Sequence, residues 1–191
     1  EYAVNLPRLV RWDLQLNKIC GTVPSEYGDV KVFTYLSHWY FQNNRISGNA
    51  AHFFQKPYLV TLSVYNNLLE GTLPTSYPSP SLRTIDVSNN RISGTLPPAL
   101  GSLPDLTTCS LQSNLLSGTL PPQLCDSQSF TNLRLQDNQL SGVIPPELAG
   151  CVQLKLLDMS NNRLSGPLPS DLDKLFTIES IFLQANRLSG P

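Results

Sequence analysis

An asparagine recurs along this chain of 191 residues at nearly constant spacing, and this repetition constrains the fold more than any other feature. The intervals between successive copies are 27, 23, 23, 24, 24, 24 and 24 residues. The copies are Asn17, Asn44, Asn67, Asn90, Asn114, Asn138, Asn162 and Asn186. A fixed period of about 20–50 residues is typical of arrays in which one structural unit stacks on the next. We therefore predict a stacked array rather than an ordinary globular domain.

Apolar residues occupy fixed places before each asparagine. They lie eight, five and three residues before it, as Leu59, Leu62 and Val64 do before Asn67. The alternation predicts a short strand with one buried face, and identical strands one repeat apart pair as a parallel sheet. A single coil is too small to bury its own apolar face, so each coil is stable only when its neighbours stack on it.

Glycine and proline punctuate the segment after each asparagine. Glycine follows four residues later in every copy, which accounts for eight of the chain's eleven glycines, and it allows positive φ or a close approach between coils. Proline usually stands three residues further on, as at Pro97, and fixes φ at the end of a short extended segment. An apolar column from Tyr27 to Leu172 comes next. We expect it to close the core as short helical or 3₁₀ turns.

The asparagine itself follows the strand, where the chain must turn inward. Its amide can donate to and accept from the backbone of the turn and of the adjoining coil. We therefore interpret the column as a buried structural ladder and not as a binding signature.

The full pattern, L-x-x-L-x-L-x-x-N-x-L-S-G-x-I/L-P over about residues 9–191, resembles the plant-type leucine-rich repeat. The resemblance implies an α/β repeat solenoid, a right-handed superhelix with a parallel β-sheet on its concave face and short helical or 3₁₀ turns on its convex face. We expect residues 1–191 to form one solenoid of about eight repeats that lacks both capping units, as a fragment of a longer chain.

The second copy is irregular. It is longer by about three residues, through Gly28 to Tyr35, and has Ala51 in place of the proline. Such a unit can mark a bend, a partner site, or the loss of regularity near a terminus, and we favour the last of these.

Composition and motifs argue against several classes of function. Charged residues make up 14% of the chain and the net charge is −1, so the basic patch typical of nucleic-acid binding is missing and contact with anionic membranes is not expected. No G-x-S-x-G elbow, phosphate-binding glycine loop or metal-ligand spacing occurs. We therefore expect no enzymatic activity, no metal and no cofactor. His38 is on the face expected to be exposed, where it is a contact residue unless an acid pairs with it.

The cysteines leave the redox compartment open. Cys109 occupies an apolar strand slot and should behave as a small buried hydrophobe. Cys151 falls in a convex core position and is expected to be buried and free. Cys125 lies two residues earlier in the preceding coil, so a Cys125–Cys151 disulfide is the alternative, at the edge of the permitted geometry.

The open face of the predicted sheet is the candidate binding surface, because solenoid curvature makes it an extended concave surface. Side chains four and two residues before each asparagine should point there. Among them Tyr40 and Tyr65 lie in adjacent coils beside His38 and Gln42, an aromatic and polar patch of the kind enriched at recognition hot spots. The structural alternative is that tyrosine is simply a good strand former. The orienting polar groups that could extend the patch are Asp86, Gln112, Arg134 and Gln136.

The resemblance also implies a class of function. Similar arrays form the ectodomains of plant receptor kinases and receptor-like proteins, and secreted inhibitors of polygalacturonases, which bind peptides, hormones, co-receptors or enzymes outside the cell. We accordingly predict a non-enzymatic recognition module of a secreted or cell-surface protein, with a protein or peptide partner on the concave face. The alternatives are a bracing element in contact with other chains of an extracellular assembly, and the sensor ectodomain of a receptor kinase.

Overall fold

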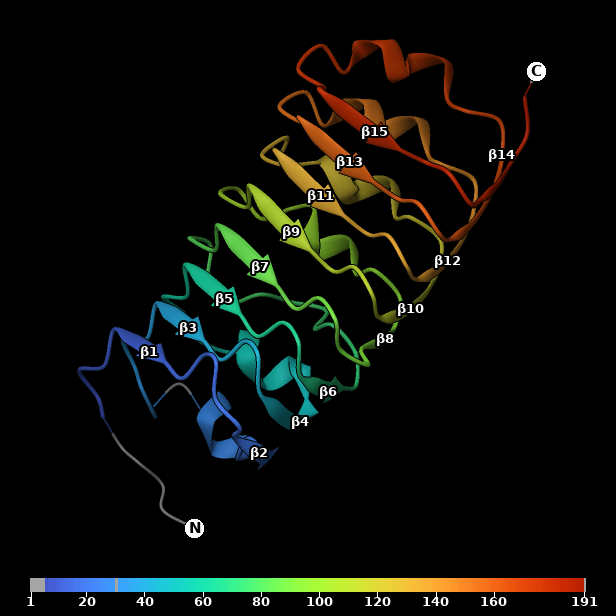
Figure 1. Ribbon diagram of the computed structural model, residues 1–191. Helices are drawn as coiled ribbons and strands as arrows, with labels where there is room; N and C mark the ends of the chain where they lie inside the picture. The colour runs from blue at the N-terminus through green and yellow to red at the C-terminus, as the bar shows by residue number, and fades with distance from the viewer. Residues whose placement is uncertain (1–5, 30, 191) are drawn as a thin grey trace.

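The computed structural model describes residues 6–29 and 31–190 as an elongated stack of coils (Figure 1). Within these residues each coil contributes one strand to an eight-stranded parallel sheet, in the order β1-β3-β5-β7-β9-β11-β13-β15. The register pairs equivalent positions of successive coils, as in Leu62 with Ile85 and Ile85 with Cys109. The strands are β1 (Arg11–Asp13), β3 (His38–Tyr40), β5 (Thr61–Ser63), β7 (Thr84–Asp86), β9 (Thr108–Ser110), β11 (Asn132–Arg134), β13 (Leu156–Asp158) and β15 (Ser180–Phe182). The predicted parallel sheet is confirmed.

A second layer of short strands follows the asparagines. It forms a three-stranded parallel sheet, β2-β4-β6, and a five-stranded one, β16-β14-β12-β10-β8, in the described part of the chain. A bridge between Thr72 and Ser93 connects the two. The sequence predicted an extended segment here but not its pairing into sheets. The strands are β2 (Cys20–Thr22), β4 (Arg45–Asn49), β6 (Leu68–Glu70), β8 (Ser93–Gly94), β10 (Leu115–Gly118), β12 (Gln139–Gly142), β14 (Arg163–Gly166) and β16 (Arg187–Leu188).

The convex side is built from 3₁₀ turns, as expected. They are η1 (Ser25–Gly28), η2 (Ala50–Phe54), η3 (Pro98–Leu100), η4 (Pro122–Cys125), η5 (Pro146–Gly150) and η6 (Ser170–Lys174). The third coil has a loop in this place, between Thr75 and Ser81, with prolines at 78 and 80. Ser79 fastens this loop, because its buried hydroxyl donates to the carbonyl of Leu59 at 2.7 Å. The solenoid fold predicted from the repeats is thus confirmed.

The core lies between the two layers of strands and the 3₁₀ turns. Residues five before the asparagine are fully covered in the middle coils, with Ile85, Cys109 and Leu133 all 0% exposed. Ile181, at the same position in the eighth coil, is 38% exposed. The difference follows from stacking, because a middle coil is covered by a neighbour on both sides.

The asparagines reach backward along the stack. The Asn114 amide nitrogen donates to the carbonyls of Leu111 in its own coil and Val87 in the preceding coil, both at 3.1 Å. Its oxygen accepts the amide N–H of Ile92, also in the preceding coil, at 2.9 Å. Among the described residues, Asn17 of the first coil donates to carbonyls of its own coil, those of Leu14 and Gln15, both at 3.0 Å. The backward set recurs at Asn44, Asn67, Asn90, Asn138, Asn162 and Asn186.

The glycine column is required by both conformation and space. Gly118 has φ of +79°, and a Cβ placed on it would lie 2.8 Å from Cγ2 of Thr95. Thr95 belongs to the preceding coil, so its methyl group occupies the space that a side chain at 118 would need. A left-handed backbone and a close neighbour together account for glycine here.

One prediction about the cysteines is wrong. Cys151 is not free but forms a disulfide with Cys125, and their Cα atoms lie 4.9 Å apart. Cys125 is the last residue of η4 and Cys151 directly follows η5, so the two cysteines lie at the ends of neighbouring turns. The prediction for Cys109 is confirmed, because its thiol is free and buried.

Candidate functional site

The strand β3 carries the centre of the predicted patch. His38 and Tyr40 flank Trp39, which is 0% exposed, so the two flanking side chains lie on the outer face of the sheet. The guanidinium carbon of Arg11, on β1, lies 4.4 Å from the centre of the Tyr40 ring. The same guanidinium bonds the Asp13 carboxylate at 2.7 Å, and this bond lowers the pKa of Asp13. Tyr40 is therefore held by a cation–π contact from the neighbouring coil.

His38 packs beside Tyr40. Their ring centres lie 6.3 Å apart with 24° between the planes. The Nδ1 atom of His38 is 2.8 Å from the hydroxyl of Ser37, and this serine is its hydrogen-bond partner among the described residues. Among the described residues, the side chain that hydrogen-bonds to this ring is thus a serine and not a carboxylate.

Tyr65 lies in the next coil, two residues after β5. Its side chain is partly exposed, and its hydroxyl accepts a long hydrogen bond from the amide of Asn43 at 3.5 Å. Asn43 in turn accepts from the amide of Asn66 at 2.8 Å. Tyr65 is thereby joined to a surface row of amides, and it lies one coil away from Tyr40.

Gln42 does not lie where it was expected. It is only 6% exposed, although the sequence placed it on the open surface. Its amide nitrogen donates to the side-chain oxygen of Gln15 at 2.5 Å, so the two glutamine side chains pack against each other. The prediction of an exposed Gln42 is wrong because amides in adjacent coils bond along the stack and cover one another. Other polar side chains of the outer face are also buried, namely Ser63, Ser88, Ser110 and Ser160.

The remaining predicted residues form a separate polar stretch over β7 to β11. Asp86 accepts two hydrogen bonds from Ser88, from its hydroxyl at 2.6 Å and its amide N–H at 3.1 Å. Burial raises the pKa of the Asp86 carboxyl, against these hydrogen bonds. Gln112 and Gln136 are partly buried, and their side-chain oxygens have no partner among the described residues. This stretch begins at β7, which pairs with β5, so Asp86 lies in the coil next to that of Tyr65.

Arg134 is the cation of this stretch. It stands opposite Ser110 and Asp158 in the sheet. The carboxylate of Asp158 is engaged by Ser160, whose hydroxyl donates to it at 2.6 Å. No ion pair between described residues includes Arg134. Its positive charge acts on the Asp86 carboxyl, where it opposes the rise in pKa caused by burial.

Sequence reasoning missed a second pair of tyrosines. Tyr35 and Tyr58 are 55% and 53% exposed, and their rings stack at 5.7 Å with 23° between the planes. Each stands nine residues before its asparagine, in two successive coils. That shared position outside the strand was the signal that could have identified them.

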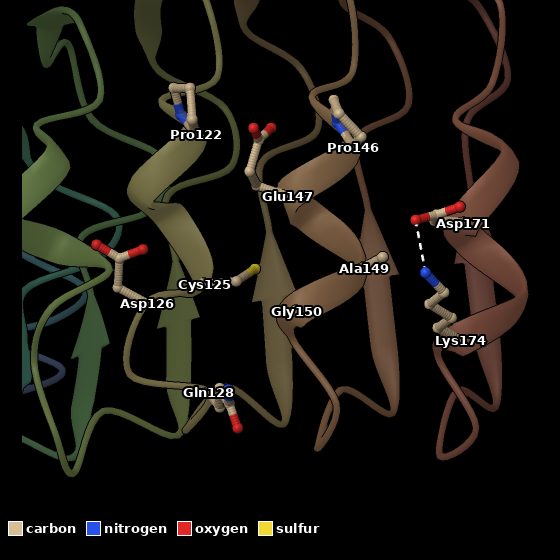
Figure 2. A pocket seen from close by; sticks show the side chains of 10 residues that line it. All are labelled: Pro122, Cys125, Asp126, Gln128, Pro146, Glu147, Ala149, Gly150, Asp171 and Lys174. Carbon is tan, nitrogen blue, oxygen red and sulfur yellow. Dashed lines mark hydrogen bonds and ion pairs between the residues drawn. The ribbon is translucent and has the colours of Figure 1, made fainter.

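A hollow also occurs on the convex side, beside the disulfide (Figure 2). It measures about 440 Å³ and is lined by residues of η4, η5 and η6, such as Glu147, and by Asp126 and Gln128, which follow η4. The carboxylate of Asp171 at its edge is already bonded to Lys174 at 2.7 Å. The hollow has no aromatic lining residue, so the concave face is the better candidate for partner recognition.

The described residues contain no group of three or more His, Cys, Asp and Glu side chains placed to hold a metal ion. None of their helices has the length and apolar character needed to cross a membrane.

Comparison with known proteins identifies the repeats. The Leucine Rich Repeat family pattern matches residues 81–103, 129–151 and 153–175. No curated protein matches the chain. Among solved structures, the ectodomain of the Arabidopsis thaliana membrane receptor kinase GASSHO1/SCHENGEN3, in complex with Casparian strip integrity factor 2, is 30% identical with a TM-score of 0.75. That match covers 94% of this chain and 24% of the receptor chain.

Two other receptors are similar. A TDR receptor is 29% identical with a TM-score of 0.80, over 93% of this chain and 31% of that one. The Arabidopsis receptor kinase HAESA, in complex with the peptide hormone IDA and the co-receptor SERK1, is 30% identical with a TM-score of 0.71. That match covers 94% of this chain and 35% of the HAESA chain. This chain thus spans between about a quarter and a third of the length of these relatives. With its eight-copy pattern, parallel solenoid and these matches, the chain belongs to the plant-type leucine-rich-repeat family.

Proposed function

We propose that this protein is a non-enzymatic recognition module that binds a protein or peptide on its concave face, at the patch formed by Arg11, His38, Tyr40 and Tyr65. The observation that carries the proposal is the arrangement of aromatic and cationic side chains on two neighbouring strands of the sheet, with Arg11 over Tyr40 and His38 beside it. Tyrosine and arginine are the residue types most enriched at binding hot spots. Arg134, Asp86, Gln112 and Gln136 supply charges and hydrogen-bonding groups that orient the partner.

The relatives support a partner of this kind. GASSHO1/SCHENGEN3 is in complex with Casparian strip integrity factor 2, and HAESA with a peptide hormone and a co-receptor. Both are receptor kinases, and the matched part of the former is its ectodomain. We place this module outside the cell on the same ground. The Cys125–Cys151 disulfide supports that location, because disulfides persist in oxidising compartments.

The test uses peptides selected on the wild-type protein from a random library displayed on phage. Replacing Tyr40 and Tyr65 together by alanine should weaken binding of the selected peptides about tenfold or more, since each hot-spot residue contributes about 1–2 kcal/mol. Thermal stability should change little, because both side chains lie on the surface. Phe176→Ala is the matched control, an exposed aromatic residue of the last coil (87%). Unchanged affinity of the double variant, or an equal loss in the control, would reject the concave site.

A second candidate function is the sensor ectodomain of a receptor kinase, which the relatives favour because they are receptor kinases. In that case a membrane span and a kinase domain are encoded in the same gene. The coding sequence on either side of residues 1–191 decides this point, and a gene that encodes neither feature would reject the candidate.

A further inference from the structure

The irregular second coil is held by a buried lysine. Lys56 is 0% exposed, and its ammonium donates to the backbone carbonyls of Asp29, at 2.5 Å, and Val32. Both carbonyls belong to the segment that makes this coil longer than the others. We call residues 29 and 31–35 of this segment the insert. A buried ammonium is costly unless it is hydrogen-bonded. Lys56 therefore fastens the insert to the stack.

The insert also has an aromatic anchor. Phe33 is 0% exposed, has φ of +55°, and packs against Trp12 and Tyr27 with ring centres 4.6 and 5.3 Å away. The Lys56 ammonium lies 5.8 Å from the centre of the Phe33 ring. Burial lowers the pKa of Lys56 to about 8. An unfavourable backbone angle and a buried cation persist only where the surroundings hold them. The insert is thus anchored by a buried ammonium and a buried aromatic ring.

The end of the insert carries Tyr35. Its ring stacks on Tyr58 of the next coil, and both rings are more than half exposed. We name this pair the tyrosine ledge. It lies just before the strands β3 and β5, and Ser37, two residues after Tyr35, contacts His38 of the concave patch. The ledge and the patch are thus connected through the same short segment of chain.

We propose that the tyrosine ledge extends the recognition surface over the edge of the sheet, and that Lys56 is the positioning residue that holds it there. This inference rests on the proposed function. Its occupant is an apolar residue of the same peptide that binds the concave patch. The equivalent positions of the adjacent coils, Arg8 and Ser81, offer no carboxylate to attract a cation. Arg8 also lines a hollow with Leu6, Pro7 and Leu9.

The positioning role can be tested without a partner. Lys56→Met keeps most of the buried stem and removes the hydrogen-bond donors. Cleavage after the exposed Lys31 by a lysine-specific protease should rise about tenfold as the insert opens locally. The magnetisation transfer between the Tyr35 and Tyr58 rings seen by NMR should disappear, while contacts among the core residues of later coils persist. Lys155→Met, at an exposed lysine, is the control. A Lys56→Met protein with unchanged cleavage and an intact ring contact overturns the positioning role.

The binding role uses the phage-selected peptides described above. Tyr35→Ala and Tyr58→Ala should each weaken binding about fivefold or more, and Lys56→Met should do the same without touching the peptide. Peptides that depend on Tyr40 and Tyr65 but tolerate both ledge variants overturn the ledge and leave the proposed function standing. If the peptides bind the Tyr40 and Tyr65 variants normally but lose affinity for the ledge variants, the concave patch is rejected and the ledge is retained.

Discussion

Each asparagine of the repeated column after the first hydrogen-bonds to backbone groups of two coils, its own and the preceding one, as Asn114 does. Asn114→Ala should lower the free energy of unfolding by about 2–6 kcal/mol, because buried groups at Val87 and Ile92 lose their partners at about 1–3 kcal/mol each. Urea unfolding measures the change. The control is Asn17→Ala in the exposed first rung, which should cost less than about 1 kcal/mol. Equal losses at both positions would contradict the ladder interpretation.

The glycine column permits a second prediction at the scale of the residue. Gly118→Ala should destabilise the protein by about 2–3 kcal/mol, because alanine must adopt positive φ and its Cβ meets the Thr95 methyl. Gly21→Ala separates the two causes. Gly21 has φ of +95° but nothing lies within 4 Å of its Cβ position, so only the backbone cost of about 1–2 kcal/mol applies. Thermal unfolding should also show Thr95→Ser relieving part of the Gly118→Ala defect.

At the scale of the element, the disulfide ties η4 to η5 across one coil boundary. Replacing both Cys125 and Cys151 by alanine should lower the free energy of unfolding by about 2–4 kcal/mol, since the bond closes a loop with a sequence separation of 26. Urea unfolding with and without a reductant gives the comparison, and the reductant should destabilise the wild type but not the double variant. Cys20→Ser should be neutral because that thiol is exposed and free. A wild type insensitive to full reduction would contradict the prediction.

The elements also show what the sequence could and could not predict. Strand positions followed from the asparagine register, because the 24-residue period places the same slot of each coil side by side. The second layer of strands was missed because its sequence, such as Leu115–Gly118, has no alternating apolar pattern and pairs only through its neighbours. The disulfide was judged less favourable because Cys125 and Cys151 differ by two positions in the repeat, and the spacing does not show that both lie at the ends of neighbouring 3₁₀ turns.

The candidate site was predictable in part for a similar reason. The register correctly assigned Tyr40 and Tyr65 to adjacent coils, but side-chain contacts between coils decided the rest. Gln42 is covered by its bond to Gln15, which no pattern in one coil reveals. The tyrosine ledge depends on the conformation of an insert that departs from the repeat, and Lys56 is a charged residue in a place where the pattern gives no reason to expect burial.

For the whole molecule, stability should vary along the stack. Amide hydrogen exchange measured by mass spectrometry should be slowest in the strands β7, β9 and β11 and fastest in β15. The core residues of the former are fully buried, whereas Ile181 in β15 is 38% exposed and has a neighbouring strand on one side only. In a solenoid each coil is stabilised mainly by its nearest neighbours, so protection should fall toward the last coil. Uniform exchange from β7 to β15 would contradict this expectation.

The backward direction of the asparagine bonds has a consequence for synthesis. Ile92 and Val87 of the fourth coil obtain their partners from Asn114, which is added to the growing chain only after that coil is complete. A coil that has just left the ribosome therefore still has open backbone groups at its turn, and the next coil closes them. The array matures in the order in which it is translated, one coil behind the newest residue, with the youngest coil always the unfinished one.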